Sequence, residues 1–413
     1  MPRTWPALLP TAFVLACWSA GRIAAADWPQ FRGPGGQGHS AEKGLALVWS
    51  ESADGQTQNI TWKTPVAGLG WSSPAIQGKQ IWLTTALDDG RSLRAVALDR
   101  DTGSILHDVE VFEKAEPGTI HNKNSHASPT PVVQGSRVYV HYGAHGTACL
   151  STKGKVLWRN TELVYNHRHG PAGSPVLYKD LLIVNCDGTD VQFVVALDQK
   201  SGAIRWKMER PGQMAYSTPL VIRVGGKDLV ISTSGEQVVA YNPSNGEAAW
   251  KVRHDGYSLV PRPVFGHGLV YVCTGYNTPL LYAIRPDGAG DVTETHVEWT
   301  IRRNVPHNPS PLLVGDELYF ISDNGIATCA DARTGQEHWQ QRIGGNFSAS
   351  PIFADGRIYF LSEDGLTTVI APGREFKKLA SNQVQGRTLA SLAVSDGAIF
   401  LRTATHLYRI EEP

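Results

Sequence analysis

The sequence has no excess of charge of either sign and few cysteines. Its 38 Lys and Arg balance its 38 Asp and Glu, and no segment is rich in basic residues, so no electropositive surface for nucleic acid is expected. The five cysteines form no C-x-x-C pair, which argues against a zinc site. We expect the four that follow the leader to be free thiols packed as small apolar side chains, because each falls in a β-like segment. They are Cys149, Cys186, Cys273 and Cys329.

Sequence motifs of several enzyme classes are also missing. The chain contains no Walker loop, no H-E-x-x-H and no G-x-S-x-G, which removes the simplest signals for nucleotide, metalloprotease and serine-hydrolase chemistry. The glycine-rich "GPGGQG" at 33–38 includes Pro34 and follows no strand, unlike a dinucleotide-binding loop. We therefore expect it to belong to a docked or flexible N-terminal segment.

A short leader precedes the rest of the chain. Arg3 is followed by the apolar run "ALLPTAFVLACW" and by "AAA" at 24–26, which is the pattern of a secretory signal with its cleavage site. The apolar run is too short to span a bilayer. We predict a signal peptide at 1–26 and an exported mature chain, periplasmic or extracellular, without a transmembrane segment. A lipid anchor at Cys17 is the alternative, although Leu15 fits poorly in a lipoprotein signal.

One sequence unit recurs along the chain. The segment "FVVALDQKSGAIRWKM" at 193–208 has relatives at 94–109, 238–252 and 327–341. Each copy has a strand of small residues and an Asp or Asn turn closed by Gly, and most copies have Trp four residues after that Gly. An internal repeat of this kind indicates a ring or an array of similar units.

A Ser/Pro step enters a strand ahead of each unit. These steps are 44 residues apart from Pro131 to Pro175 and again from Pro175 to Pro219, and the chain contains eight units. Within a unit, β-branched and aromatic runs alternate with turn dipeptides such as Gly-Asp and Asn-Gly, which predicts four short antiparallel strands. Sheets of this size bury their faces only against one another, so the repeat predicts an all-β, eight-bladed β-propeller of four-stranded antiparallel blades.

The two ends of the chain are predicted to meet in the last blade. The last unit supplies only three strands, and "NITWKTPV" at 59–66 is the expected outer strand that closes the ring. The propeller then covers 59–413 and leaves 27–58 as an N-terminal segment. The repeated tryptophans are expected to pack between neighbouring blades. They are Trp62, Trp158, Trp206, Trp250, Trp299 and Trp339.

The repeat can be compared with a known family. The pattern A-x-D-x-x-T-G-x-x-x-W, with Ser-Pro strand entries, resembles the pyrroloquinoline-quinone (PQQ)-type repeat of the quinoprotein-like propellers. "DWPQFRGPGGQG" at 27–38 is also similar to the mature start of exported bacterial members of that superfamily. The resemblance covers about residues 59–413. It implies the fold and leaves the function open, because quinoprotein alcohol dehydrogenases and quinone-free outer-membrane assembly (BamB-type) propellers share it.

The resemblance implies specific parts for a quinone-dependent dehydrogenase. Calcium would need Glu, Asn and Asp oxygens, together with an Asp base near the quinone. The sequence contains no Cys-Cys pair for the vicinal disulfide of the alcohol dehydrogenases and no C-x-x-C-H haem motif. Soluble sugar dehydrogenases bind the quinone without that disulfide, so a different quinone enzyme stays open.

The stretch "HNKNSHASPTP" at 121–131 marks a candidate ligand site. In a propeller the inner strands begin at one mouth of the central channel, so the residues before each Ser/Pro step converge there. They are richer in His, Arg and aromatic groups than a solvated turn requires, and imidazoles from several blades could meet a metal or an anionic ligand. The candidate ligand-binding residues are Trp71, Asn124, His126, His169, Tyr216, Arg262, His307, Asn308 and Asn346.

Three functions are compatible with this sequence. The first prediction is a monomeric binding or scaffold module of the cell envelope, with an envelope protein, a peptide or a small molecule as its ligand. The second is a periplasmic oxidoreductase that uses PQQ and Ca²⁺, with His126, His169, Arg262 and His307 at the channel mouth. The third is a metal-dependent hydrolase built on the histidines. The sequence alone assigns no catalytic residue, no metal ligand and no cofactor.

Overall fold

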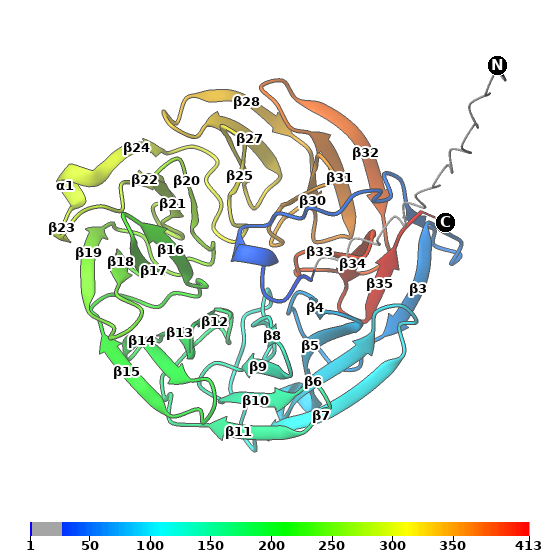
Figure 1. Ribbon diagram of the computed structural model, residues 1–413, viewed down its shortest axis with the longest axis horizontal. Coiled ribbons are helices and arrows are strands. Elements are labelled where there is room, and N and C mark those ends of the chain that lie inside the picture. Colours follow the sequence, from blue (N-terminus) through cyan, green and yellow to red (C-terminus); the bar gives the residue numbers. More distant parts are fainter. Residues whose placement is uncertain (2–26, 413) are drawn as a thin grey trace.

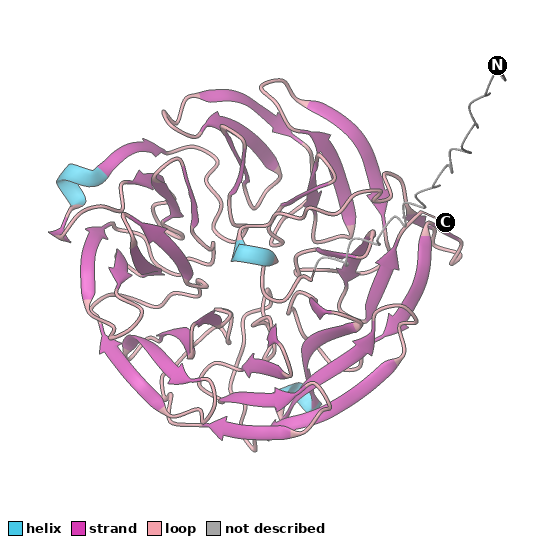
Figure 2. Ribbon diagram, viewed as in Figure 1, coloured by secondary structure: helices cyan, strands magenta, loops and turns pink. Residues whose placement is uncertain are grey.

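The fold is an eight-bladed β-propeller, as the repeats predict. The computed structural model describes Met1 and residues 27–412, in which eight sheets surround a central axis (Figure 1). The helical segments of the described chain are short (Figure 2): η1 (Pro34–Gly36), η2 (Asp88–Gly90) and α1 (Thr293–His296). None of them is long and apolar enough to cross a membrane. Cys17 and the predicted leader, apart from Met1, lie outside the described residues.

The first four blades follow the chain in order. Their strands are β4 (Ala75–Gln77), β5 (Gln80–Leu87), β6 (Ser92–Asp99) and β7 (Ile105–Glu113); β8 (Val132–Gln134), β9 (Arg137–His141), β10 (Thr147–Ser151) and β11 (Val156–Asn160); β12 (Val176–Tyr178), β13 (Leu181–Asp187), β14 (Gln192–Asp198) and β15 (Ile204–Glu209); and β16 (Leu220–Val224), β17 (Lys227–Ser234), β18 (Gln237–Tyr241) and β19 (Ala248–Arg253).

The last four blades complete the ring. Their strands are β20 (Val264–Gly266), β21 (Leu269–Cys273), β22 (Leu281–Ile284) and β24 (Val297–Ile301); β25 (Leu312–Val314), β26 (Glu317–Ile321), β27 (Ile326–Asp331) and β28 (Glu337–Arg342); β29 (Ile352–Ala354), β30 (Arg357–Leu361), β31 (Leu366–Ala371) and β32 (Lys377–Gln383); and β33 (Ala393–Ser395), β34 (Ala398–Arg402), β35 (His406–Ile410) and β3 (Ile60–Pro65).

Burial follows the position of a strand within its blade. Middle strands such as β13 are buried along their whole length, whereas the outer strand β3 alternates between half-buried and exposed residues. The middle strands are covered by neighbouring blades on both faces, so they are continuous apolar runs, while an outer strand has one face in solvent. The four cysteines Cys149, Cys186, Cys273 and Cys329 are free and buried in these middle strands.

Each Asp of the repeat builds the turn before an outer strand. The Asp198 carboxylate accepts hydrogen bonds from the backbone N–H groups of Lys200 (3.0 Å) and Ser201 (2.8 Å), and Gly202 N–H donates to the Asp198 carbonyl at 2.8 Å. Gly202 has a φ of 78°, a conformation that favours glycine. The Asp and the Gly of the repeat are therefore turn-forming residues.

The repeated tryptophans dock on the turn of the next blade. Trp206 Nε1 donates to the carbonyl of Pro243 at 3.0 Å, and a Cβ on Gly246 would come within 2.7 Å of the same indole. Trp158 makes the equivalent contacts with Gln199 and Gly202. Trp62, Trp250 and Trp339 likewise donate to carbonyls of the following blade, and Trp299 lies against Gly335. The glycine of one repeat thus leaves room for the indole of the preceding repeat.

The N-terminal strand closes the ring. β3 pairs antiparallel with β35, with Trp62 opposite Arg409 and Pro65 opposite His406. β3 is therefore the outer strand of the blade formed by the last three strands of the chain. This pairing confirms the closure predicted from the three-stranded final repeat.

The segment before β3 lies across one end of the channel. Trp28 bridges to Ile76 of the first blade, and His39 bridges to Phe353 of the seventh. Between them η1 sits at the centre of the ring (Figure 1). Ile76 and Phe353 lie in inner strands, on the C-terminal side of their Ser/Pro steps. Since the inner strands begin at the predicted mouth, the segment covers the opposite end of the channel.

Two outer strands carry additional pairing. β1 (Ser50–Glu51) and β2 (Thr57–Gln58) extend the seventh blade beyond β32, and β23 (Gly290–Asp291) lies parallel to β19. β23 and α1 belong to the long loop of the fifth repeat. That loop is therefore bound to the edge of the fourth blade and does not lie over the channel.

Candidate functional site

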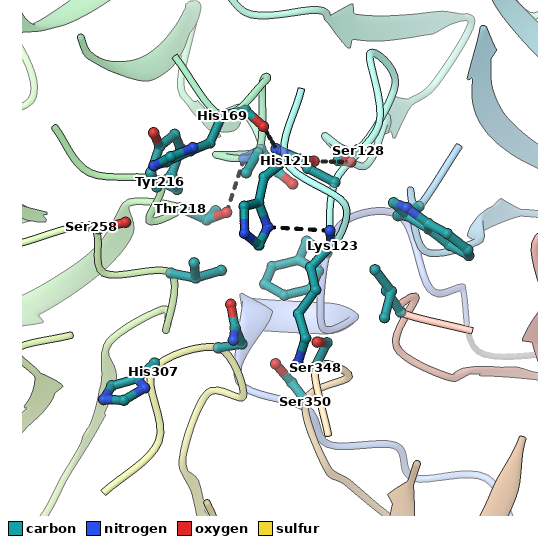
Figure 3. Close-up of a pocket in the computed structure, with 18 of the residues that line it drawn as sticks. His121, Lys123, Ser128, His169, Tyr216, Thr218, Ser258, His307, Ser348 and Ser350 are labelled. Carbon is teal, nitrogen blue, oxygen red and sulfur yellow. Dashed lines mark hydrogen bonds between the residues drawn. The ribbon is translucent and has the colours of Figure 1, made fainter. Parts of the chain in front are cut away.

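A cup opens at the predicted mouth of the channel. It has a volume of about 570 Å³, which is within the range of small-molecule sites. Its wall comes from the loops before the inner strands, and its floor includes Phe31 of the N-terminal segment. Figure 3 shows His121 and Lys123 on one side of the cup and His307 on the other.

A ring of hydroxyl groups surrounds the deep part of the cup. Seven of the eight strand entries place one Ser or Thr on the channel. In six of these seven the backbone N–H donates to the hydroxyl oxygen of the next blade. The bonds run Ser391 to Ser73, Ser73 to Thr130, Thr130 to Ser174, Ser174 to Thr218, Ser310 to Ser350 and Ser350 to Ser391, at 2.9–3.0 Å. The repeated hydroxyl therefore links the blades through their innermost strands.

Arg262 occupies the eighth position of this hydroxyl ring. Its backbone N–H donates to Ser310 at 2.9 Å, but it offers no hydroxyl to Thr218, so the ring has one gap. Its guanidinium donates to the carbonyls of Phe31 (2.8 Å) and Pro219 (3.1 Å), and it is 2% exposed. Arg262 therefore holds the N-terminal segment in place at the floor and is not a residue of the mouth.

A second buried guanidinium lies near Arg262. Arg32 is fully buried, donates to the carbonyl of Gln37 at 3.1 Å, and has no partner at Nε or Nη1. Burial lowers the pKa of both guanidinium groups, and the charge of Arg262 adds to the effect on Arg32, but both stay charged at neutral pH. Neither has an ion pair within the described chain, so the closed end of the channel is electropositive.

One side of the mouth is built by the loops of the second and third blades. Asn124 donates to the carbonyl of His169 at 2.7 Å, which ties the two loops together. The His169 ring lies 5.4 Å from that of His121 and 5.9 Å from that of Tyr216. Burial, followed by the neighbouring His121 and Arg168, lowers the pKa of His169. Burial raises the pKa of Tyr216 to about 12, so its hydroxyl keeps its proton.

The opposite side is organised by Asp323. Its carboxylate accepts from the backbone N–H of His307 at 2.7 Å and from the side-chain amide of Asn308. The imidazole of His307 lies 3.8 Å from the same carboxylate and 6.0 Å, ring to ring, from Tyr276. Asp323 is thus engaged behind the wall and does not itself line the cup.

The third side of the cup carries two cationic side chains, Lys123 and Arg387, which share the carboxylate of Glu363. Lys123 Nζ lies 2.8 Å from Glu363, and the guanidinium of Arg387 is 3.9 Å from the same carboxylate. Arg387 also stands 5.8 Å from the centre of the Trp71 ring, a cation–π distance. No Asp or Glu is among the described residues that line the cup.

The structure brings together six of the nine predicted ligand residues. Trp71, Asn124, His169, Tyr216, His307 and Asn308 line the cup. The other three do not: Arg262 lies at the floor beneath Phe31, Asn346 is exposed on its loop, and His126 points between blades against Gly90. His126 was predicted at the mouth from its position in the chain alone. Successive side chains of an extended segment point in opposite directions, so its neighbours can face the cup while His126 faces away from it.

Sequence reasoning missed several residues of the cup. Phe31 enters from the unrepeated N-terminal segment, and His121 and Lys123 come from the quoted stretch but were not among the candidates. Most of the hydroxyl ring was visible in the sequence as the Ser or Thr before Pro in six of the eight strand entries. We interpreted those residues only as entries to strands, and their regular spacing is the signal that could have identified the ring.

His126 belongs to a buried histidine cluster. Its ring is 5.7 Å from that of His145, which is 5.0 Å from His167. His141 is also buried and bonds to Thr147 at 2.8 Å. Burial, with smaller effects of neighbouring imidazoles, lowers the pKa of His141 and His145 to about 3 and that of His167 to about 4. These three imidazoles are therefore neutral at pH 7.

The residues of the cup do not fit a calcium-bound quinone. Calcium requires six to eight oxygen ligands, several of them carboxylates, and none of the described residues that line the cup carries a carboxylate. No group of three or more His, Cys, Asp or Glu in the described residues is arranged to hold a metal ion. We therefore derive no quinone or metal chemistry from this site.

The fold and the repeat define the class of protein as a PQQ-like repeat propeller. Two solved structures share the fold over most of this chain. A quinohemoprotein alcohol dehydrogenase from Pseudomonas putida has a TM-score of 0.66 at 10% identity and covers 94% of this chain and 80% of its own. A europium-containing methanol dehydrogenase has a TM-score of 0.64 at 11% identity, covering 92% and 90%. Identities this low show the fold alone.

The particular family is shown by the sequence. The family model described as outer membrane protein assembly factor BamB matches residues 52–160, 95–341 and 295–399, and the chain belongs to that family. The structure of BamB from Moraxella catarrhalis has a TM-score of 0.59 at 14% identity and covers 86% of this chain and 98% of its own.

Curated relatives match over shorter stretches. An outer membrane protein assembly factor BamB from Burkholderia pseudomallei is 30% identical over 114 residues, which is 27% of this chain and 29% of the relative. The protein of that name from Moranella endobia is 27% identical over 166 residues, or 36% and 39%. The matched stretches thus span less than two fifths of either relative.

Proposed function

We propose that this chain is an exported, partner-binding propeller of the cell envelope that acts as a scaffold through the face around the cup. The match of the BamB family model to residues 52–399 carries this proposal. The relatives are described as outer membrane protein assembly factors, which supports an envelope protein as the proposed partner. The expected location is the periplasm.

The mouth face supports partner binding. Leu69, Val164 and Tyr276 are 38%, 72% and 56% exposed and lie on loops that open on this face. Exposed apolar and aromatic side chains around a polar depression are typical of a protein–protein contact. Each of these loops is held by the rigid ring beneath it, so little order has to be gained on binding.

Site-specific cross-linking tests this function. A photo-reactive amino acid is placed at Val164 or Tyr276 of the full chain, expressed in the cells that naturally produce it. The control position is Lys200, which is exposed on a turn at the outer rim. We expect a discrete cross-link to an envelope protein from both mouth positions and none from Lys200, and we expect the protein in the periplasmic fraction.

A substitution pair completes the experiment. Val164→Asp with Tyr276→Asp should abolish the cross-link reported from a third mouth position, Leu69, because the charges oppose burial of the apolar contact. A cytoplasmic location, or equal cross-linking from Lys200 and from the mouth, contradicts the proposal.

A further inference from the structure

The cup has hydroxyl hydrogen-bond donors without an acceptor in the part of the chain that the structure describes. Ser73, Thr130, Ser174, Thr218 and Ser391 each accept one backbone N–H in the hydroxyl ring. No acceptor for any of their hydroxyl protons is found in the described chain. All five are at most 4% exposed and all line the cup. Five O–H groups are thus available to a ligand at the same depth.

The ring differs at its two remaining hydroxyls. Ser350 Oγ donates to Ser310 Oγ at 3.0 Å, so the proton of Ser350 is used within the ring. Ser310 Oγ accepts that bond and is not among the residues that line the cup. The unused donors that line the cup therefore lie on the arc formed by the first four blades and the eighth. A ligand with several acceptor oxygens would satisfy them from the channel axis.

The charges around the cup favour an anion. Lys123 and Arg168 line the cup, and Arg168 has no ion pair in the described chain. Arg387 stands beside the wall at Trp71, and Arg262 lies beneath the floor. Two carboxylates, Glu363 and Asp323, are nearby; both stand behind the lining and are already bonded. Lys123 and Arg168 thus present positive charge directly to the cavity, and no carboxylate is among the described residues that line it.

We propose that the cup binds a carboxylate-bearing ligand, with its carboxylate oxygens on the free hydroxyls of the ring and on the cations of the mouth. Carboxylate oxygens accept hydrogen bonds and donate none, which matches a lining of free O–H, ammonium and guanidinium groups. Trp71, Tyr216 and Phe31 supply apolar walls for the rest of the ligand.

The carboxylate has two sources that the structure allows. One is a small polycarboxylate that fits in about 570 Å³. The other is an acidic chain end of the partner that docks on the mouth face. The second source rests on the proposed function, whereas the first does not require it.

The test is calorimetric titration of the full mature chain with two probes. Citrate represents the small-molecule source. An eight-residue peptide with three glutamates and a free C-terminus represents the chain end. Its control is the same peptide with glutamine in place of each glutamate and an amidated C-terminus, so that it has no carboxylate. The uncharged polyol erythritol controls for hydroxyl-based binding. We expect citrate or the acidic peptide to bind, and neither neutral compound.

Variants locate the binding to the cup. Arg168→Gln removes an exposed cation, and Thr218→Val removes one O–H donor at nearly constant volume. We expect each to weaken binding by about fivefold or more, since each removes a hydrogen bond to a charged group. Lys200→Gln, an exposed substitution at the outer rim, should leave the affinity unchanged. Arg168→Gln keeps the test decisive even if Thr218→Val fails to fold.

The outcomes separate the two sources. Binding of citrate that is at least as tight as that of the acidic peptide assigns the cup to a small molecule. Tighter binding of the peptide, lost on removal of its carboxylates, assigns it to a partner's chain end. The inference is overturned if neither probe binds, or if Arg168→Gln and Lys200→Gln bind equally well. Such a result would not affect cross-linking from Val164. The proposal of a ligand in the cup and the proposal of a partner on the mouth face can therefore fail independently.

Discussion

At the scale of single residues, the buried histidines make the stability of the folded protein sensitive to acid. His141, His145 and His167 have their pKa lowered in the folded protein, to about 3, 3 and 4. In the unfolded chain they titrate near the ordinary value of about 6.5. Below that pH the unfolded state binds more protons than the folded state, so stability is complete above about pH 6.5 and is lost as the pH falls towards the folded values.

This linkage predicts the shape of the pH dependence. Each of the three groups contributes up to about 1.4 kcal/mol per pH unit between about pH 6.5 and its folded pKa. We expect the free energy of unfolding in urea to fall steeply from pH 6.5 to pH 5. His145→Gln should make that slope shallower. A slope that is the same in the variant would show that His145 has no part in it.

The sequence placed some side chains of the mouth correctly and others not. The mouth position of His169 and Tyr216 follows from their place before a Ser/Pro step, and the structure puts both in the cup. His126 has the same kind of position, but its ring turns between the blades to meet His145. Direction of a side chain depends on local backbone angles, which a repeat alignment does not fix. The burial of Arg262 under Phe31 depends on a segment outside the repeat.

At the scale of elements, the turn glycine and the tryptophan of the preceding blade form one contact. Gly246 has a φ of 80°, and a Cβ there would lie 2.7 Å from the Trp206 ring. Gly246→Ala is expected to lower the free energy of unfolding by about 2–4 kcal/mol, through backbone strain and overpacking together.

Gly356 is the matched control for this prediction. Its φ of 72° is similar, but a Cβ there would have nothing within 4 Å. Gly356→Ala should therefore cost only the backbone strain, about 1 kcal/mol. Chemical unfolding of the two variants measures the difference. Equal losses in the two would contradict a role of Gly246 in seating the indole.

The elements were the most predictable level of this structure. Strand runs, Asp–Gly turns and the tryptophan recur in the sequence, so the eight blades and the closing strand β3 could be deduced from the sequence alone. η1 and the path of residues 27–49 could not, because that segment occurs once and its conformation depends on Arg262, Ile76 and Phe353.

At the scale of the whole molecule, the N-terminal region has two separable tasks. Residues 27–49 cover the channel and place Trp28 and Trp49 in a core shared with the first blade and the last two blades. β3 completes the ring. A chain that begins at residue 50 should therefore remain a folded ring of lower stability, whereas a chain that begins at residue 67 lacks the outer strand of its last blade.

Truncation distinguishes the two tasks. We expect the chain from residue 50 to unfold cooperatively at a lower urea concentration and to elute as a compact species. The chain from residue 67 should expose the edge of β35 and associate or unfold, since an open strand edge pairs with other chains. Size-exclusion chromatography and urea titration measure both. Equal behaviour of the two chains would show that closure by β3 is not needed.

The covered channel has a kinetic consequence. Since Phe31 and η1 block one end, anything in the cup can enter and leave only through the mouth. The same face carries Leu69, Val164 and Tyr276, on which a partner is proposed to dock. A docked partner would therefore close the mouth of the cup. It would slow the dissociation of a ligand already bound in the cup and would prevent a later ligand from binding. The order of arrival, more than the affinity of either, would then decide which complex forms.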